Sequence, residues 1–294
     1  MSCQTGTAPI NITTKPKSTC DRLCKFNYQY SDSSCNVNNM EQYLKIDYDD
    51  SKGPSIIYNS ISMNVDEIRM YRPSLHKYNG NQADSEIIIK HSGNGNNLLV
   101  CVPIMISASK TDASQLFETI LSNVLTKAPN SGESTTINVK NFNLNSIVPE
   151  ASFNSYSGTL PYLPCTGKYN YVVFDIKDGC KITPDSFNDL SKLISKQTYT
   201  IKTNDFFFNK TGSKEGLSTT DLGDGYYLEC NPVDTEGTLL FSENKDSLDS
   251  TSGGGGVTVY KSKKTIINSE VLIIFVGGVL VALIISLVIK RYRT

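Results

Sequence analysis

The sequence predicts a mainly β domain of the α+β class, followed by one membrane-spanning helix near the C-terminus. Short apolar or alternating runs recur along the chain and are separated by turns that contain Asn and Gly, which is typical of strands joined by hairpins. Two further segments have apolar residues at helical spacing, and one uncharged apolar run lies near the C-terminus. At 294 residues the chain is long enough for one large domain with a single core.

The predicted strands are the apolar or alternating runs 56–63, 85–91, 98–106, 170–176 and 199–203. Turn clusters lie between them, at Asn79-Gly80 and at Gly93-Asn94-Gly95. Because Asn and Gly readily adopt positive φ, these clusters favour tight hairpin turns. We therefore expect a core made mainly of strands.

Two amphipathic helices are expected to pack against these strands. The apolar face of the first contains Phe117, Ile120, Leu121, Val124 and Leu125. The second begins at Thr183-Pro184, a typical helix start, and its apolar face contains Phe187, Leu190, Leu193 and Ile194. Both patterns indicate structural helices.

An apolar run of 19 residues without charge, 271–289, lies near the C-terminus and is flanked by Glu270 and the sequence KRYR. A helix of this length spans about 28 Å, close to the hydrocarbon thickness of a bilayer. A buried helix of a soluble core is the less favoured alternative. We predict a head domain at 1–241, a flexible Gly/Ser/Lys stalk at 242–267, a transmembrane helix at 268–289 and a basic tail at 290–294.

The N-terminal residues 1–13 lack the basic and apolar regions of a signal peptide, so we expect a tail-anchored protein. Without Lys290, Arg291 and Arg293, 25 of the 28 Lys and Arg remain against 29 Asp and Glu, which leaves the head near −4. This balance argues against a strongly basic surface for nucleic acid, so no nucleic-acid partner is expected.

Eight cysteines lie in the head, at positions 3, 20, 24, 35, 101, 165, 180 and 230. Their even number is consistent with several disulfides. Cys20 and Cys24 with Cys35 leave a metal site open as a less favoured alternative, because no histidine lies nearby. Cys101, inside an apolar run, is expected to be a buried free thiol.

Three segments in order resemble the α-carbonic anhydrase family. Residues 8–12 (APINI) are similar to the family's SPINI start, 85–91 (SEIIIKH) to AELHLVH, and 156–166 (YSGTLPYLPCT) to YPGSLTTPPCT. The resemblance implies a carbonic-anhydrase-like head with a twisted, mostly antiparallel central sheet and short peripheral helices. It also implies a disulfide between Cys3 and Cys165.

The family binds catalytic Zn²⁺ through three histidines, and the resemblance assigns those positions to Arg69, Tyr71 and Ile88, none of which is histidine. Its hydroxyl-orienting threonine is matched by Pro161. The chain has only two histidines, His76 and His91, which match structural positions. We therefore expect no catalytic residues, no metal or other cofactor, and no hydration of CO₂.

A carbonic-anhydrase-like head, a polar stalk and one C-terminal span resemble the cell-surface-binding envelope proteins of poxviruses. This resemblance implies a virion membrane protein with the head outside the particle and the short tail inside, held in the lipid bilayer through 271–289. Its partner would be a host glycosaminoglycan such as chondroitin sulfate, or another receptor, bound in a basic crevice near the lost zinc site. The candidate glycan-binding residues are Arg69, Arg72, Lys45, Lys77 and Lys90.

The alternative is a structural or protein-binding virion membrane protein with no glycan ligand. The acidic residues Asp47, Asp49 and Asp50, which follow Lys45, favour this alternative. The sequence also leaves open whether the chain forms a homo-oligomer through the head or the helix.

Overall fold

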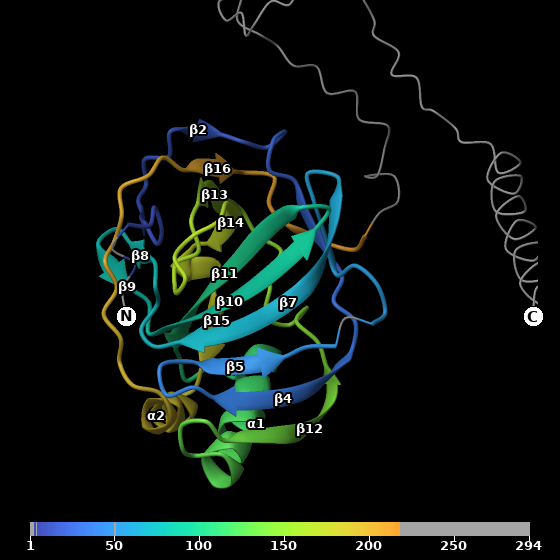
Figure 1. Ribbon diagram of the computed structural model, residues 1–294, viewed down its shortest axis with the longest axis vertical. Helices are drawn as coiled ribbons and strands as arrows, with labels where there is room; N and C mark the ends of the chain where they lie inside the picture. The colour runs from blue at the N-terminus through green and yellow to red at the C-terminus, as the bar shows by residue number, and fades with distance from the viewer. Residues whose placement is uncertain (1–2, 4, 50, 218–294) are drawn as a thin grey trace, which may run out of the picture. The chain divides into compact units, whose positions relative to one another are not determined.

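The structure is a computed structural model that describes residues 3, 5–49 and 51–217 (Figure 1). Within these residues no helix is both long and apolar enough to cross a bilayer. The predicted stalk, transmembrane helix and basic tail lie outside the described residues, as does Cys230.

The described part is mainly β, as predicted. Its strands are β1 (Asn11–Ile12), β2 (Ser18–Thr19), β3 (Phe26–Tyr28), β4 (Ser33–Asn39), β5 (Leu44–Asp47), β6 (Ile56–Tyr58), β7 (Ile61–Tyr71), β8 (Lys77–Tyr78), β9 (Asn81–Gln82), β10 (Ser85–Gly93), β11 (Asn96–Ile106), β12 (Ser134–Phe142), β13 (Phe153–Gly158), β14 (Tyr169–Phe174), β15 (Cys180–Ile182), β16 (Phe207–Asn209) and β17 (Lys214–Glu215). The helices are α1 (Asp112–Lys127), α2 (Pro184–Leu193) and a short 3₁₀ helix, η1 (Ile176–Asp178).

A 14-stranded sheet forms the centre of the fold, with the order β12-β4-β5-β7-β10-β11-β14-β13-β16-β2 along its main path. The long strands β7, β10 and β11 lie at its middle and pair antiparallel (Figure 1). The sheet is mixed, because β14 and β15 run parallel to β11 and β2 runs parallel to β16. A small three-stranded sheet, β1-β8-β9, lies beside it.

Both predicted helices form, and their caps explain where they begin. The Thr111 side chain accepts a hydrogen bond from the Ser114 backbone in a capping box at the start of α1, and Thr183 caps α2 ahead of Pro184. Helix α1 packs against β12, β15 and α2. The expected apolar residues face inward, except that Leu125 and Phe187 are only partly buried.

Two predicted strands differ from the structure. The run 56–63 is a hairpin, because Asn59 and Ser60 both adopt positive φ and form a two-residue turn between β6 and β7. The run 199–203 is not a strand: its backbone has one isolated bridge, between Lys202 and Ile10. The turns predicted at Asn79-Gly80 and at Gly93-Asn94-Gly95 do join β8 to β9 and β10 to β11.

The sheet is covered on both faces by separate apolar clusters. The central strand β10 shows the division, because Ile87 and Ile89 lie in the larger cluster and Ile88 lies in the smaller one. Alternate residues of a strand point to opposite faces, so a strand between two cores is apolar along most of its length. This explains why 85–91 does not alternate in sequence.

His91 is fully buried on β10 among aromatic side chains. Its Nε2 atom lies 3.0 Å from the Tyr30 hydroxyl, and the two ring centroids are 5.9 Å apart. Burial lowers the pKa of His91 to about 3, because a charged ring there would lose its hydration. The folded head therefore requires a neutral His91.

The buried neutral histidine predicts a loss of stability in acid. The unfolded chain takes up a proton below about pH 6.5 and the folded chain does not, so stability is retained above that pH and falls between about pH 6.5 and 3. Lowering the pH from 7.5 to 5.5 should reduce the free energy of unfolding by about 1 kcal/mol more in the wild type than in His91→Gln. Urea unfolding at the two pH values measures this difference, and an equal loss in both proteins would contradict it.

Four cysteines of the described head form two disulfides. Cys3 and Cys165, 162 positions apart, are bonded with their Cα atoms 5.5 Å apart, as the resemblance implies. Cys20 and Cys24 form the second bridge, so the metal site considered for them is wrong. Cys101 is a buried free thiol as predicted, and Cys35 and Cys180 are free and buried as well.

The two bridges should differ in their contribution to stability, because they close loops of very different length. In the chain-entropy model the Cys3–Cys165 bridge contributes about 5 kcal/mol and the Cys20–Cys24 bridge about 2 kcal/mol. Cys3→Ser/Cys165→Ser should therefore lose more unfolding free energy than Cys20→Ser/Cys24→Ser, as measured by chemical denaturation. The reverse order would show that the long loop is already constrained in the unfolded chain.

Candidate functional site

The three positions assigned to zinc ligands lie together on one face of the sheet. Arg69 and Tyr71 are on β7 and Ile88 is on the neighbouring strand β10. Arg69 pairs directly with Ile88, and Tyr71 pairs with Glu86. Directly paired residues share a face, as do residues two apart on one strand, so these side chains converge.

The guanidinium of Arg69 is held between two tyrosine rings. Its Cζ atom lies 4.4 Å from the ring centroid of Tyr43 and 3.8 Å from that of Tyr162. Nη2 pairs with Glu67 at 2.9 Å, and Nη1 donates to the Tyr71 hydroxyl at 3.2 Å. Burial alone would lower the pKa of Arg69, but Tyr71 and the Glu67 hydrogen bond outweigh it and the net direction is upward. Arg69 is therefore a fixed positive charge in the site.

A cleft of about 310 Å³ opens beside Arg69, and we call it the tyrosine cleft. It is lined by Met40, Gln42, Tyr43, Arg69, Tyr71, Tyr162, Leu163 and Tyr199. Leu163 and Met40 are 54% and 41% exposed, which is unusual for large apolar side chains of this head. Nε of Arg69 and the Tyr162 hydroxyl are buried and have no hydrogen-bond partner within the described residues. The cleft therefore combines aromatic rings with two unused donors.

Sequence reasoning missed three of the cleft tyrosines, Tyr43, Tyr162 and Tyr199. Tyr162 follows Pro161 in the segment 156–166, so the family motif places it next to the position that the resemblance assigns to the site. Pro161 is buried beside it. Tyr43 precedes β5, and Tyr199 belongs to the segment that was expected to be a strand. Nothing in the sequence spacing predicts that these two rings line the cleft.

A hydrogen-bonded group lies deeper in the sheet. Glu86 accepts from the backbone N–H groups of Leu75 and His76 at 2.7 and 3.2 Å. The two ring nitrogens of His76 lie 2.7 Å from Glu86 Oε1 and 2.7 Å from the Tyr156 hydroxyl. Cys101 completes a set of three potential metal ligands with His76 and Glu86, whose ligand atoms all lie within 4.8 Å of one another. Both histidine nitrogens already have partners, so this group is structural.

The candidate glycan-binding residues near the tyrosine cleft have acidic partners. Lys45, which pairs directly with Arg69 across β5 and β7, contacts Asp47 at 2.8 Å. Lys90 on β10 contacts Asp66 at 3.3 Å. Together with the Arg69–Glu67 pair, these contacts leave the cleft close to electrically neutral.

The other two candidates lie elsewhere. Arg72 donates from Nη1 to the carbonyl oxygens of Ser191 and Ile194 at the end of α2, so it lies outside the tyrosine cleft. Lys77 lies on β8 in the small sheet and is half-buried. The structure therefore brings Lys45 and Arg69 together and separates them from Arg72 and Lys77.

Comparison with known protein families identifies the family of the chain. The family model of eukaryotic-type carbonic anhydrase matches residues 2–206. The chain belongs to the carbonic anhydrase family. No curated protein sequence matches it.

Solved carbonic anhydrase structures share its fold. The Thermovibrio ammonificans α-carbonic anhydrase, solved with sulfanilamide, has a TM-score of 0.57 at 18% identity, over 69% of this chain and 86% of that one. The Photobacterium profundum α-carbonic anhydrase gives 0.56 at 14%, over 69% and 88%. Dioscorin, solved with ascorbate, gives 0.55 at 12%, over 70% and 86%.

The residues of this carbonic anhydrase family member do not fit the family's zinc ion. Arginine and isoleucine offer no lone pair to a metal. Burial raises the pKa of Tyr71 well above its usual value, so its hydroxyl stays protonated and is a poor ligand. The guanidinium of Arg69 would also repel a dication at this place.

Restoring the donor set should restore metal binding. Arg69→His, Tyr71→His and Ile88→His together would place three imidazoles on one face of β7 and β10, the donor set of a catalytic zinc site. The triple variant should hold about one equivalent of Zn²⁺ that a chelator removes, whereas the wild type and the Ile88→His control should hold far less. Metal analysis after dialysis measures this. A wild-type protein that retains one equivalent would contradict our reading of the site.

Proposed function

We propose that this carbonic anhydrase family member is catalytically inactive and acts as a viral envelope protein that attaches the virion to a glycosaminoglycan, such as chondroitin sulfate, on the host cell. The observation that carries the proposal is the tyrosine cleft, in which tyrosine rings enclose Arg69 at the positions that the resemblance assigns to the family's zinc ligands. Without zinc ligands the chain has no means of activating water by the family's route.

The chemistry of the cleft supports a sugar ligand. A tyrosine side chain combines an apolar ring with a hydroxyl, which suits the apolar face and the hydroxyl edge of a sugar ring. The Nε–H of Arg69 and the Tyr162 hydroxyl are unpartnered but covered, so they could donate to sugar oxygens only after the surrounding rings shift. A concave site with rings and a few polar groups is the usual form of a small-ligand site.

The proposal includes the membrane assignment. The apolar run 271–289 would anchor the chain in the virion membrane, with the head outside and the basic tail inside. The resemblance to poxvirus cell-surface-binding envelope proteins supports this placement through shared architecture.

A second candidate function is binding of a protein without a glycan. The observation in its favour is the exposure of Leu163 and Met40 at the edge of the cleft, together with the acidic partners of Lys45 and Lys90. Such a surface would suit an apolar side chain of a partner protein.

One pair of variants separates the two candidates. Tyr199→Ala removes a half-buried ring from the cleft and should weaken binding of the full chain, kept in mild detergent, to immobilised chondroitin sulfate about tenfold, as loss of about 1.4 kcal/mol would. Leu163→Ala should leave that affinity nearly unchanged. Surface plasmon resonance over a salt series measures both. Absence of wild-type binding at low salt would remove the glycan proposal and leave the protein-binding one.

A further inference from the structure

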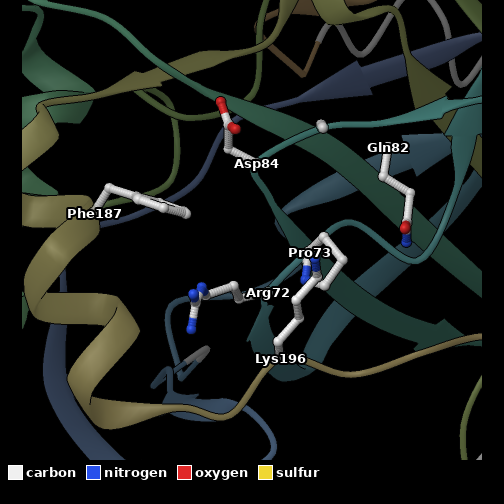
Figure 2. A pocket seen from close by; sticks show the side chains of 7 residues that line it. Arg72, Pro73, Gln82, Asp84, Phe187 and Lys196 are labelled. Carbon is white, nitrogen blue, oxygen red and sulfur yellow. The ribbon is translucent and has the colours of Figure 1, made fainter.

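A second pocket, with a volume of about 370 Å³, lies beside helix α2 and outside the tyrosine cleft (Figure 2). It is lined by Arg72, Pro73, Gln82, Ala83, Asp84, Phe187 and Lys196. Two of these side chains are cationic and one is acidic, so the pocket carries a net positive charge. We call it the α2 pocket.

Arg72 is positioned in this pocket by the end of the helix. Its Nη1 donates to the carbonyl oxygens of Ser191 and Ile194 at 3.4 and 3.3 Å, and its Cζ lies 5.5 Å from the ring centroid of Phe187. These contacts use one guanidinium nitrogen, and Nε and Nη2 have no hydrogen-bond partner within residues 3, 5–49 and 51–217. A half-buried guanidinium with two unused nitrogens is well suited to an oxyanion.

Lys196 supplies the second cation. It is exposed, and no carboxylate of the described head pairs with it or with Arg72. Arg69, Lys45 and Lys90 differ in this respect, because each contacts an acidic side chain. Positive charge without a counter-charge is therefore found in the α2 pocket and not in the tyrosine cleft.

The acidic residue of the pocket does not cancel this charge. Asp84 Oδ2 accepts a hydrogen bond from the backbone N–H of Ile106 at 2.8 Å, which directs the carboxylate toward the end of β11. Figure 2 shows the Asp84 carboxylate pointing away from Arg72, while the Arg72 guanidinium lies on the α2 side near Phe187. An anion between Arg72 and Lys196 would therefore not face the carboxylate directly.

The two cavities are joined by one short segment. Lys196 lines the α2 pocket and Tyr199 lines the tyrosine cleft, three residues later in the chain. Three residues span at most about 11 Å even when fully extended. The backbones of these two lining residues therefore lie within the length of a few sugar rings.

From these contacts we infer that the α2 pocket binds the acidic group, a sulfate ester or a carboxylate, of a saccharide whose rings occupy the tyrosine cleft. The saccharide part of this inference rests on the proposed function, and the anion site does not. Arg72 and Lys196 hold the oxyanion, and Phe187 holds Arg72 in place. Binding at this site adds selectivity for acidic over neutral sugars.

The anion site is tested with inorganic sulfate as the probe, added to the full chain in mild detergent at constant ionic strength against chloride. Sulfate stabilises many proteins by exclusion from their surface, so the comparison is between variants. The rise in Tm caused by sulfate should be smaller in Lys196→Gln than in the wild type. The control Lys127→Gln, which removes an exposed lysine at the end of α1, should show the same rise as the wild type. An equal increase in all three proteins would overturn the anion site.

The saccharide is tested with chondroitin sulfate and with desulfated chondroitin, by the same surface assay. Lys196→Gln should weaken binding of the sulfated chain about tenfold. A smaller loss with the desulfated chain, which keeps its carboxylates, would assign the sulfate ester to the α2 pocket, and an equal loss would assign the carboxylate. Unchanged affinity for the sulfated chain would remove the α2 pocket from recognition while leaving the proposed function intact. A sulfate effect on Tm without any chondroitin binding would keep the anion site and refute the proposed function.

Discussion

The carboxyl group of Glu86, buried at the centre of the sheet, is the constraint on which the site depends. A buried carboxyl is tolerated only where donors surround it, because it loses its hydration on folding. The backbone N–H groups of Leu75 and His76 and the His76 ring meet this need, and His76 extends the contacts to Tyr156. One set of hydrogen bonds therefore ties β10 to β13 and to the segment after β7. The same hydrogen bonds fix Glu86 directly opposite Tyr71, on the face that carries Arg69 and Ile88.

On that face the positive charge of Arg69 requires several matching side chains around it. A buried guanidinium is stable there only if its charge is compensated. Glu67 pairs with it, Tyr71 accepts one hydrogen bond, and the rings of Tyr43 and Tyr162 enclose it, whereas Nε has no partner within the described residues. The enclosing rings also line the cleft above the sheet, together with Tyr71 and Tyr199. Arg69 thus both stands at a position that the resemblance assigns to a zinc ligand and forms part of the tyrosine cleft.

Much of the fold could be predicted from local pattern and resemblance, whereas the cleft could not. Helical spacing identified α1 and α2, and the resemblance assigned Arg69 and Ile88 to one site on neighbouring strands and joined Cys3 to Cys165. Tyr43 reaches Arg69, and Tyr199 reaches Tyr71, only through tertiary packing, which no spacing rule encodes. Arg72 is separated from Arg69 because β7 ends at Tyr71, and the Arg72 side chain beyond the strand contacts the end of α2 instead of the cleft. The hairpin at Asn59 and Ser60 was hidden because an apolar run does not show where a strand turns.

The distribution of charge constrains how such a head can recognise an acidic partner. Its sequence is close to neutral or slightly acidic, and the cations near the tyrosine cleft are paired with carboxylates, so the head exerts little long-range attraction on a polyanion. At physiological salt, exposed charges are screened beyond about 8 Å, which leaves recognition to groups in direct contact with the ligand. A protein of this kind would select its partner by the shape of the aromatic cleft and by one well-placed anion contact. For binding, the charge density along the glycosaminoglycan would then matter less than the distance between a sugar ring and an acidic group within one short stretch of the saccharide.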